Sequence, residues 1–197
     1  MREMIRLFVV IFIFSALSGV LLTVLYTGTE ARIAYQELKF IKGPALKQTM
    51  KGASNDPLGT RFKLMDEKEE RDFFVGIVDG EPKVVAFETF GKGFDGDVGV
   101  IVAINTDDDT ILGIGVTTNK ETPGVGKRIE TDINFRSQFD GLSLEQPIKL
   151  KKDGGQIDAI SGASFSSAGV VGAVESAEEI YKRMKPEILQ KMKAFKS

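Results

Sequence analysis

Residues Leu7–Tyr26 form a run of twenty residues without a charged side chain, and this run limits how the chain can fold more than any other feature. As an α-helix the run rises about 30 Å, which is enough to cross the hydrocarbon core of a bilayer. Ser15, Ser18 and Gly19 fall on roughly one side of that helix, and membrane helices approach one another on such small-residue faces. We therefore predict that residues 1–28 form a short tail and a transmembrane helix.

A cleaved signal peptide is the alternative interpretation, with Arg2 and Arg6 as its positive end and Leu7–Phe14 as its apolar core. The apolar run, however, continues well past Ser18, and no Ala-x-Ala cleavage sequence follows at the right distance. The length of the run therefore favours an anchor that is retained in the mature protein.

The orientation of this helix is predicted from its short N-terminal tail. Basic residues flank both ends of the apolar run, so the count of positive charges on the two sides is nearly balanced. A six-residue tail is readily kept in the cytoplasm, whereas large domains cross the membrane largely regardless of their charge. We predict a single-pass protein of the cytoplasmic (inner) membrane, with the N-terminus inside and the C-terminal domain on the extracytoplasmic, periplasmic side.

The composition excludes several kinds of chemistry. The 197 residues include no histidine, cysteine or tryptophan, which excludes thiolate and imidazole metal ligands, cysteine-ligated clusters and disulfides. Nucleophile–base pairs built on histidine or cysteine are excluded as well. A net charge of −2 gives no support for nucleic-acid binding. A redox role would therefore need an organic cofactor to supply the chemistry.

The region from Arg61 to Thr118 has the pattern of hairpin-connected strands. Val98–Asn105 and Ile111–Thr118 flank a turn, and both faces of this hairpin are apolar, so helices or another layer must cover the sheet. Earlier strands are predicted at Phe73–Val78 and Lys83–Phe90. Strands first and helices later predict an α+β fold, with a mainly antiparallel sheet covered by helices. Residues 29–60 are predicted as a helical stalk and linker, and residues 61–197 as one domain.

The segment Asp158–Ser167 has the features of an anion site. It follows a strand-like Gln156–Ile160 and precedes a small-residue helix at about Ala168–Met184. Small residues let the backbone come close to a ligand, and four hydroxyls surround the N-terminus of the coming helix, where a phosphate is favoured. The alternative is that an aspartate or serine of this segment merely caps the helix.

Two glycine-bearing loops precede this segment. Gly91–Gly96 leads into a strand, so it is a poor dinucleotide-binding fingerprint. Glu121–Gly126 follows a strand and precedes a helix predicted near Ile129–Phe139. Its Pro123-Gly124 pair indicates a type II turn with exposed backbone amides, although an ordinary connection between a strand and a helix has the same signature.

These segments together carry a resemblance to a known family. Asp158-x-x-Ser161-Gly162-Ala163-Ser164 matches the Asp-x-x-[Ser/Thr]-Gly-Ala-[Thr/Ser] flavinylation motif of the FMN-binding domain family. Gly91-Lys92-Gly93 and Lys120–Gly126 occur in the order and approximate spacing seen there. With the single N-terminal helix, the whole chain resembles the G subunits of Rnf electron-transport complexes, which are related to the C subunits of the sodium-pumping NADH:quinone reductase.

The resemblance implies that FMN is joined through its phosphate to the hydroxyl of Ser164, where the family more often has threonine, by a separate flavin transferase. It also implies that Asp158 is recognised by the transferase, and this carboxylate could in addition accept backbone N–H bonds from the loop. No catalytic residue and no metal site are predicted. The predicted cofactor-binding residues are Ser164 as the covalent site, with Asp158, Ser161, Gly162, Ala163, Phe165, Ser167, Glu121, Thr122, Gly124, Val125, Gly126, Gly91, Lys92 and Gly93.

The resemblance further implies an electron carrier within an ion-translocating ferredoxin:NAD oxidoreductase complex. Such a carrier would exchange electrons with flavin or iron–sulfur subunits and would complete no reaction by itself. Two alternatives remain at this point. One is a membrane-tethered binding or assembly module without flavin, and the other is a self-sufficient extracytoplasmic flavin reductase, for which 197 residues leave little room.

Overall fold

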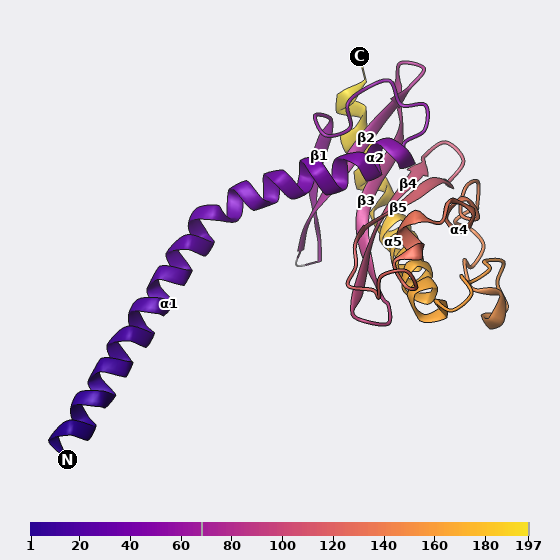
Figure 1. Cartoon of the computed structure of the whole chain (residues 1–197). Coiled ribbons are helices and arrows are strands. Elements are labelled where there is room, and N and C mark those ends of the chain that lie inside the picture. Colours follow the sequence, from indigo (N-terminus) through magenta and orange to yellow (C-terminus); the bar gives the residue numbers. More distant parts are fainter. Residues whose placement is uncertain (68, 197) are drawn as a thin grey trace. The chain divides into compact units, whose positions relative to one another are not determined.

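The computed structural model describes residues 1–67 and 69–196, and the chain divides into two compact units, Met1–Lys39 and Phe40–Ser197. The first unit is built on one helix, α1 (Arg2–Glu37) (Figure 1). Its large apolar side chains are exposed along its length. Within it, Arg2–Glu30 is long and apolar enough to cross a membrane, and it is the one helix of the described residues that meets this test. The apolar run predicted as a helix is therefore helical.

The second unit contains one antiparallel sheet with the strands in sequence order. The strands are β1 (Arg61–Asp66), β2 (Glu69–Val78), β3 (Glu81–Lys92), β4 (Asp97–Asn105) and β5 (Thr110–Thr118) (Figure 1). Each strand pairs with the next one along the chain, as short hairpin connections require. The predicted α+β fold with an antiparallel sheet is confirmed.

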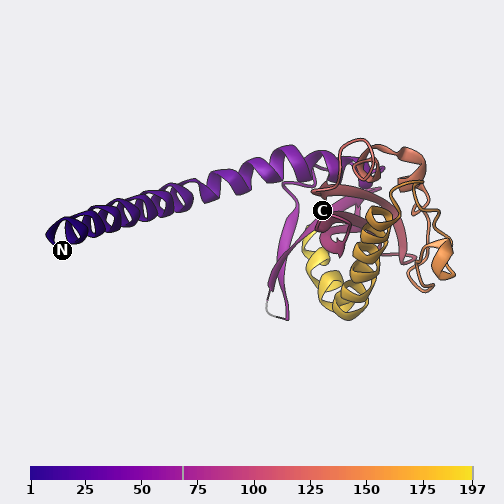
Figure 2. The ribbon, with the colours of Figure 1, turned by 60° about the horizontal axis from the view of Figure 1, so that its bottom comes forward.

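Helices cover the two faces of the sheet. The long helix α5 (Ser164–Met192) packs on β3 and β4 (Figure 2), while α2 (Gly43–Thr49), which follows a π-helical turn at Leu38–Lys42, packs on β4 and β5. Gly113 and Gly115 of β5 face Thr49 and Ala45 of α2, on the side opposite to the α5 contacts. Residues predicted as part of a linker thus form the helix that covers the second face.

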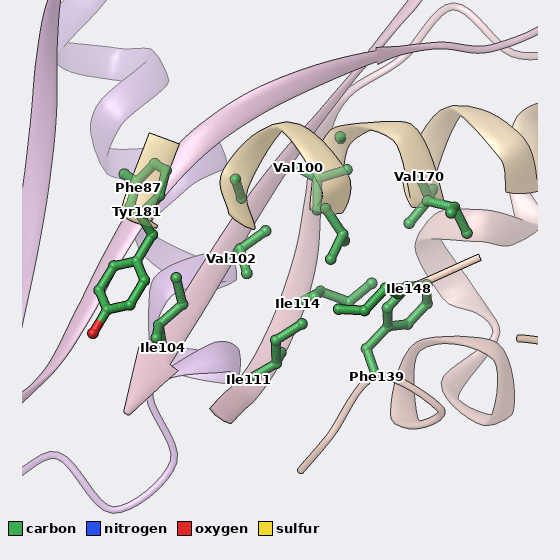
Figure 3. Close-up of a cluster of buried hydrophobic side chains, with 14 of the residues drawn as sticks. Phe87, Val100, Val102, Ile104, Ile111, Ile114, Phe139, Ile148, Val170 and Tyr181 are labelled. Carbon is green, nitrogen blue, oxygen red and sulfur yellow. The ribbon is translucent and has the colours of Figure 1, made fainter. Parts of the chain in front are cut away.

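The main core lies between α5 and the sheet. Its side chains alternate along the strands and recur along one side of α5, as burial of one face of each element requires (Figure 3). Phe87, Val100 and Val102 of the sheet meet Val170 and the ring of Tyr181 from the helix. Phe139 and Ile148 close the same core from the segment between β5 and α5.

The connection between β5 and α5 differs from the prediction. The single helix predicted near Ile129–Phe139 is wrong, because the chain forms α3 (Arg128–Thr131) and α4 (Ile133–Ser137). Asp132 separates them in an extended conformation, and its carboxylate accepts the Phe135 N–H at 3.2 Å. The strand predicted at Gln156–Ile160 is also wrong, since this segment contributes one isolated bridge, between Ile157 and Leu150.

The contact between β3 and α5 is unusually close. The Thr89 hydroxyl donates to the Ala173 carbonyl at 2.8 Å, although the two residues belong to different elements. A Cβ added at Gly91 would lie 2.0 Å from the Gly169 carbonyl oxygen and 2.5 Å from the Ala173 backbone nitrogen. The helix can therefore approach the strand this closely only where both carry glycine.

We predict that Gly91→Ala lowers the free energy of unfolding by about 1–3 kcal/mol, because the methyl group would force α5 away from β3. Gly172→Ala is the matched control, since a Cβ there would lie 4.0 Å from Gly91 Cα and meet nothing closer. It should leave stability unchanged or raise it by up to about 1 kcal/mol, as alanine does inside helices. Urea unfolding of the full-length protein measures both, and equal midpoints for the two variants would contradict the close contact.

Candidate functional site

Three segments that are far apart in the sequence meet at one end of the sheet. They are the β3–β4 turn (residues 93–96), the loop that follows β5 (residues 119–127) and the segment that leads into α5 (residues 160–167). Together they form a pocket of about 240 Å³. It is lined by Phe94, Glu121, Thr122, Val125, Gly126, Gly162, Ala163, Ser164, Phe165 and Ser166.

A buried carboxylate connects the three segments. Glu121 is only 2% exposed, and its Oε1 accepts the backbone N–H groups of Phe94 at 2.8 Å and Asp95 at 3.2 Å. Its Oε2 accepts the hydroxyl of Ser166 at 2.5 Å. The backbone N–H of Glu121 itself donates to the side-chain oxygen of Asn119 at 3.3 Å. The Glu121 side chain thus joins its own loop to the other two segments.

The four serines near the start of α5 have different environments. Ser166 and Ser167 are buried, and the Ser167 hydroxyl oxygen accepts the Ile160 N–H at 3.0 Å. Ser164 is exposed, is the first residue of α5 and lines the pocket. Ser161 is also exposed, but it lies outside the pocket lining. Ser164 therefore combines an accessible hydroxyl with the N–H groups of a first helical turn, which have no partner within the helix.

The alternative in which this segment merely caps the helix is not supported. The N-cap residue of α5 is Ala163, and no side chain makes a capping hydrogen bond there. Asp158 lies farther away, where its carboxylate accepts the Lys151 ammonium at 2.5 Å. Its backbone N–H donates to the Gln138 side chain at 2.7 Å. Among the described contacts, the Asp158 carboxylate binds a lysine and not the backbone of the loop.

The turn after β5 has the geometry that its sequence predicts. Gly124 has a φ of 76°, and the Val125 N–H donates to the Thr122 carbonyl at 3.3 Å. A positive φ at the third residue and this hydrogen bond are the marks of a type II turn. The turn brings Thr122, Val125 and Gly126 to the pocket, while Gly124 itself points to open space and does not line it.

Three large apolar side chains stand exposed around the pocket, and we call them the apolar rim. Phe94 is 70% exposed, Phe165 is 67% exposed and Val125 is 47% exposed. The rings of Phe94 and Phe165 touch, with centroids 6.1 Å apart and planes at 51°. Exposed apolar side chains that gather at a concave site indicate a ligand with an apolar face.

The structure brings eight of the predicted binding residues into the pocket lining and places seven outside it. Inside are Glu121, Thr122, Val125, Gly126, Gly162, Ala163, Ser164 and Phe165. Outside are Asp158, Ser161, Ser167, Gly124, Gly91, Lys92 and Gly93. A Cβ at Gly91 would meet the backbone of α5, whereas a Cβ at Gly93 would meet the Glu121 carboxylate. Ser166 has no place among the predicted residues, and its bond to a glutamate 45 positions away leaves no signal in the local sequence.

Comparison with known proteins finds related sequences that match most of this chain. The FMN-binding domain model matches residues 93–179, which include all three segments of the pocket. The chain is 33% identical to the G subunit of the ion-translocating oxidoreductase complex of Methanosarcina acetivorans over 183 residues, 89% of this chain and 93% of that one. It is 31% identical to the corresponding G subunit of Cereibacter sphaeroides over 185 residues, 90% of this chain and 84% of that one.

A solved structure has the same fold. The crystal structure of NqrC from Shewanella oneidensis aligns with a TM-score of 0.52 and 25% identity, and the alignment covers 73% of this chain and 72% of that one. The antiparallel sheet with its covering helices is therefore the fold of an FMN-binding domain.

We predict different effects for two serines of the segment before α5. Ser167→Ala leaves the buried N–H of Ile160 without an acceptor and should lower the free energy of unfolding by about 1–3 kcal/mol. Ser161→Ala removes an exposed hydroxyl and should change it by less than about 0.5 kcal/mol. Chemical unfolding of the full-length protein measures the difference. Equal stabilities would mean that the Ser167 bond contributes nothing.

Proposed function

The chain belongs to the family of G subunits of ion-translocating oxidoreductase complexes, and on this basis we propose that it is a membrane-anchored electron carrier that holds FMN covalently on Ser164. Family membership supports an electron-transfer component of such a complex, and the match to FMN-binding domains supports FMN as its cofactor. The covalent bond, the anchor and the complex type are the proposed parts.

The different environments of the serines support Ser164 as the point of attachment. A phosphoester needs a hydroxyl that a transferase can reach, and Ser164 is exposed at the pocket. Ser166 and Ser167 are buried and engaged with Glu121 and Ile160. A phosphate on Ser164 would also lie at the N-terminus of a helix of 29 residues, where backbone N–H groups and the helix dipole stabilise an anion.

The residues of the pocket fit a partly exposed flavin. The apolar rim offers contact to a planar aromatic ring, and Thr122 adds a hydroxyl. The pocket volume of about 240 Å³ is below the roughly 300–1,000 Å³ of pockets that enclose a small ligand. Part of the ring would therefore stay outside the protein, as close approach of an electron partner requires. Bound FMN supplies the redox chemistry, and the protein supplies its position.

We further propose that α1 anchors the carrier in the cytoplasmic membrane, with its N-terminus inside and residues 61–197 on the extracytoplasmic side. The apolar stretch Arg2–Glu30 and the family membership support the anchor. The complex would be of the Rnf type, coupling electron flow between ferredoxin and NAD to ion movement. Its flavin and iron–sulfur subunits would be the electron partners, and a flavin transferase would act during maturation.

The attachment is tested by the intact mass of the protein made together with an active flavin transferase. The native sequence should gain the mass of FMN less one water, and peptide sequencing should place the gain on Ser164. Ser164→Ala should lose the whole increment, whereas Ser164→Thr and Ser161→Ala should keep it. An unmodified mass for the native sequence, or flavin retained by Ser164→Ala, would refute the proposal.

The absence of native cysteine allows a clean test of orientation. Lys152→Cys places one thiol at an exposed position of the domain, and Glu3→Cys places one in the first turn of α1, before the apolar run. A membrane-impermeant maleimide added to intact cells or spheroplasts should label Lys152→Cys, and it should label Glu3→Cys only after the membrane is permeabilised. The reverse pattern would contradict the proposed orientation.

A further inference from the structure

We propose that Glu121 is the positioning residue of the site, a single buried carboxylate that holds all three side chains of the apolar rim in place before any cofactor arrives. This inference rests on the proposed function only in naming the flavin as what the rim receives. The contacts, the space around the carboxylate and the places of the rim residues in the chain support it independently.

The first support is the set of groups that Glu121 binds. Its two oxygens accept three hydrogen bonds, from the Phe94 and Asp95 amides and from the Ser166 hydroxyl. Hydrogen bonds to an ionised acceptor are stronger than neutral ones, and they are stronger still where water is excluded. Among the ion pairs of the described residues none includes Glu121, so its partners there are hydrogen-bond donors and not a cation.

The second support is the space left around the carboxylate. A Cβ at Gly93 would lie 2.3 Å from Glu121 Oε1, and a Cβ at Gly126 would lie 2.7 Å from Oε2 and 2.8 Å from Ser166 Oγ. Real Cβ atoms do not come this close to a neighbour. Gly93 and Gly126 therefore have a role that does not require them to touch a ligand, because they leave room for the carboxylate to reach two loops at once.

The third support is the order of residues along each segment. Phe94 is bound through its own backbone N–H, and it directly follows Gly93. Phe165 directly precedes Ser166, whose hydroxyl is bound. Val125 directly precedes Gly126, which packs on the carboxylate. Phe94 and Phe165 are thus bound by, or adjacent to, a group that donates to Glu121, and Val125 adjoins a glycine that lies against the carboxylate.

A physical reason connects this arrangement to the site. Exposed apolar side chains on mobile loops gain free energy by collapsing onto the nearest apolar surface. A rim that must stay open to receive a flat ring therefore needs contacts that keep the backbone beneath it in place. The hydrogen bonds of one buried residue, which joins the three segments, provide these contacts. Such preorganisation lowers the free-energy cost of binding.

The experiment uses the unloaded full-length chain in detergent, made without transferase, so that its result does not depend on flavin. Two quantities are measured: amide hydrogen exchange at Phe94 and Asp95, and the nuclear Overhauser effect between the rings of Phe94 and Phe165. We expect Glu121→Ala to accelerate exchange at both amides by roughly tenfold or more and to abolish the ring–ring signal, while amides of β2 and β4 stay as slow as in the native chain.

Glu121→Gln tests the hydrogen bonds separately from the charge. Its amide oxygen can still accept the two backbone N–H groups, and its amide nitrogen can donate to the Ser166 oxygen. It should therefore restore the ring–ring signal and most of the slow exchange. Glu88→Gln is the matched control, because Glu88 is another mostly buried carboxylate, bound to Lys42 and the Thr117 hydroxyl on the other face of the sheet. It should leave both quantities at the rim unchanged.

The proposal is overturned if the ring–ring signal persists in Glu121→Ala, or if exchange rises equally in the sheet and at the rim. If Glu121→Ala does not fold, Ser166→Ala takes its place, because it removes one of the three donors. It should weaken the ring–ring signal, and an unchanged signal in that variant would also overturn the proposal. If FMN fails to attach to Ser164, the proposed function is refuted. The hydrogen-exchange and ring–ring results of the unloaded chain can still be interpreted in that case.

Discussion

The site depends on the close contact between α5 and β3. Gly169 of the helix lies against Gly91 and Gly93 at the strand end, so near that a Cβ on any of the three would meet backbone atoms or the Glu121 carboxylate at 2.9 Å or less. This contact sets how close the first turn of α5 lies to the β3–β4 turn. In this packing the Glu121 carboxylate reaches Phe94 and Ser166 at once. The stability of the core and the geometry of the pocket therefore share one requirement, which is that these positions carry no side chain.

Much of the fold can be predicted from local sequence because its causes are local. The uncharged run at Leu7–Tyr26 makes a helix, and the apolar strands of the hairpin Val98–Thr118 make a sheet that both α2 and α5 must cover. The break between α3 and α4 escapes prediction because Asp132 caps a helix in the middle of an otherwise continuous helical pattern. The segment Gln156–Ile160 has the composition of a strand, but it has no extended partner in the sheet.

The site is harder to predict for a different reason. The motif around Ser164 is contiguous, so its residues can be found together, and the Pro123-Gly124 turn has its own local signature. The bond between Glu121 and Ser166 joins residues 45 positions apart, and no spacing rule predicts it. The order of Gly91 and Gly93 in the chain associates them with the cofactor, yet neither lines the pocket: Gly91 packs against α5, and Gly93 leaves room for the Glu121 carboxylate. A glycine in a motif can be needed to let a helix approach as well as to let a ligand approach, and only the fold distinguishes the two.

An open pocket and the proposed covalent bond would be two parts of one solution. A carrier that passes electrons to another protein gains from an exposed flavin edge, but a pocket of about 240 Å³ buries little of a flavin and so gives little binding free energy. A phosphoester on Ser164 would remove the need for tight binding, because a tethered group stays at high effective concentration over the pocket even when each contact is weak. The rim would then have to orient the ring and not to retain it. That division of labour requires a rim that is already in position. A buried carboxylate that joins its own loop to the other two segments meets this requirement without contributing any surface that an electron partner must displace.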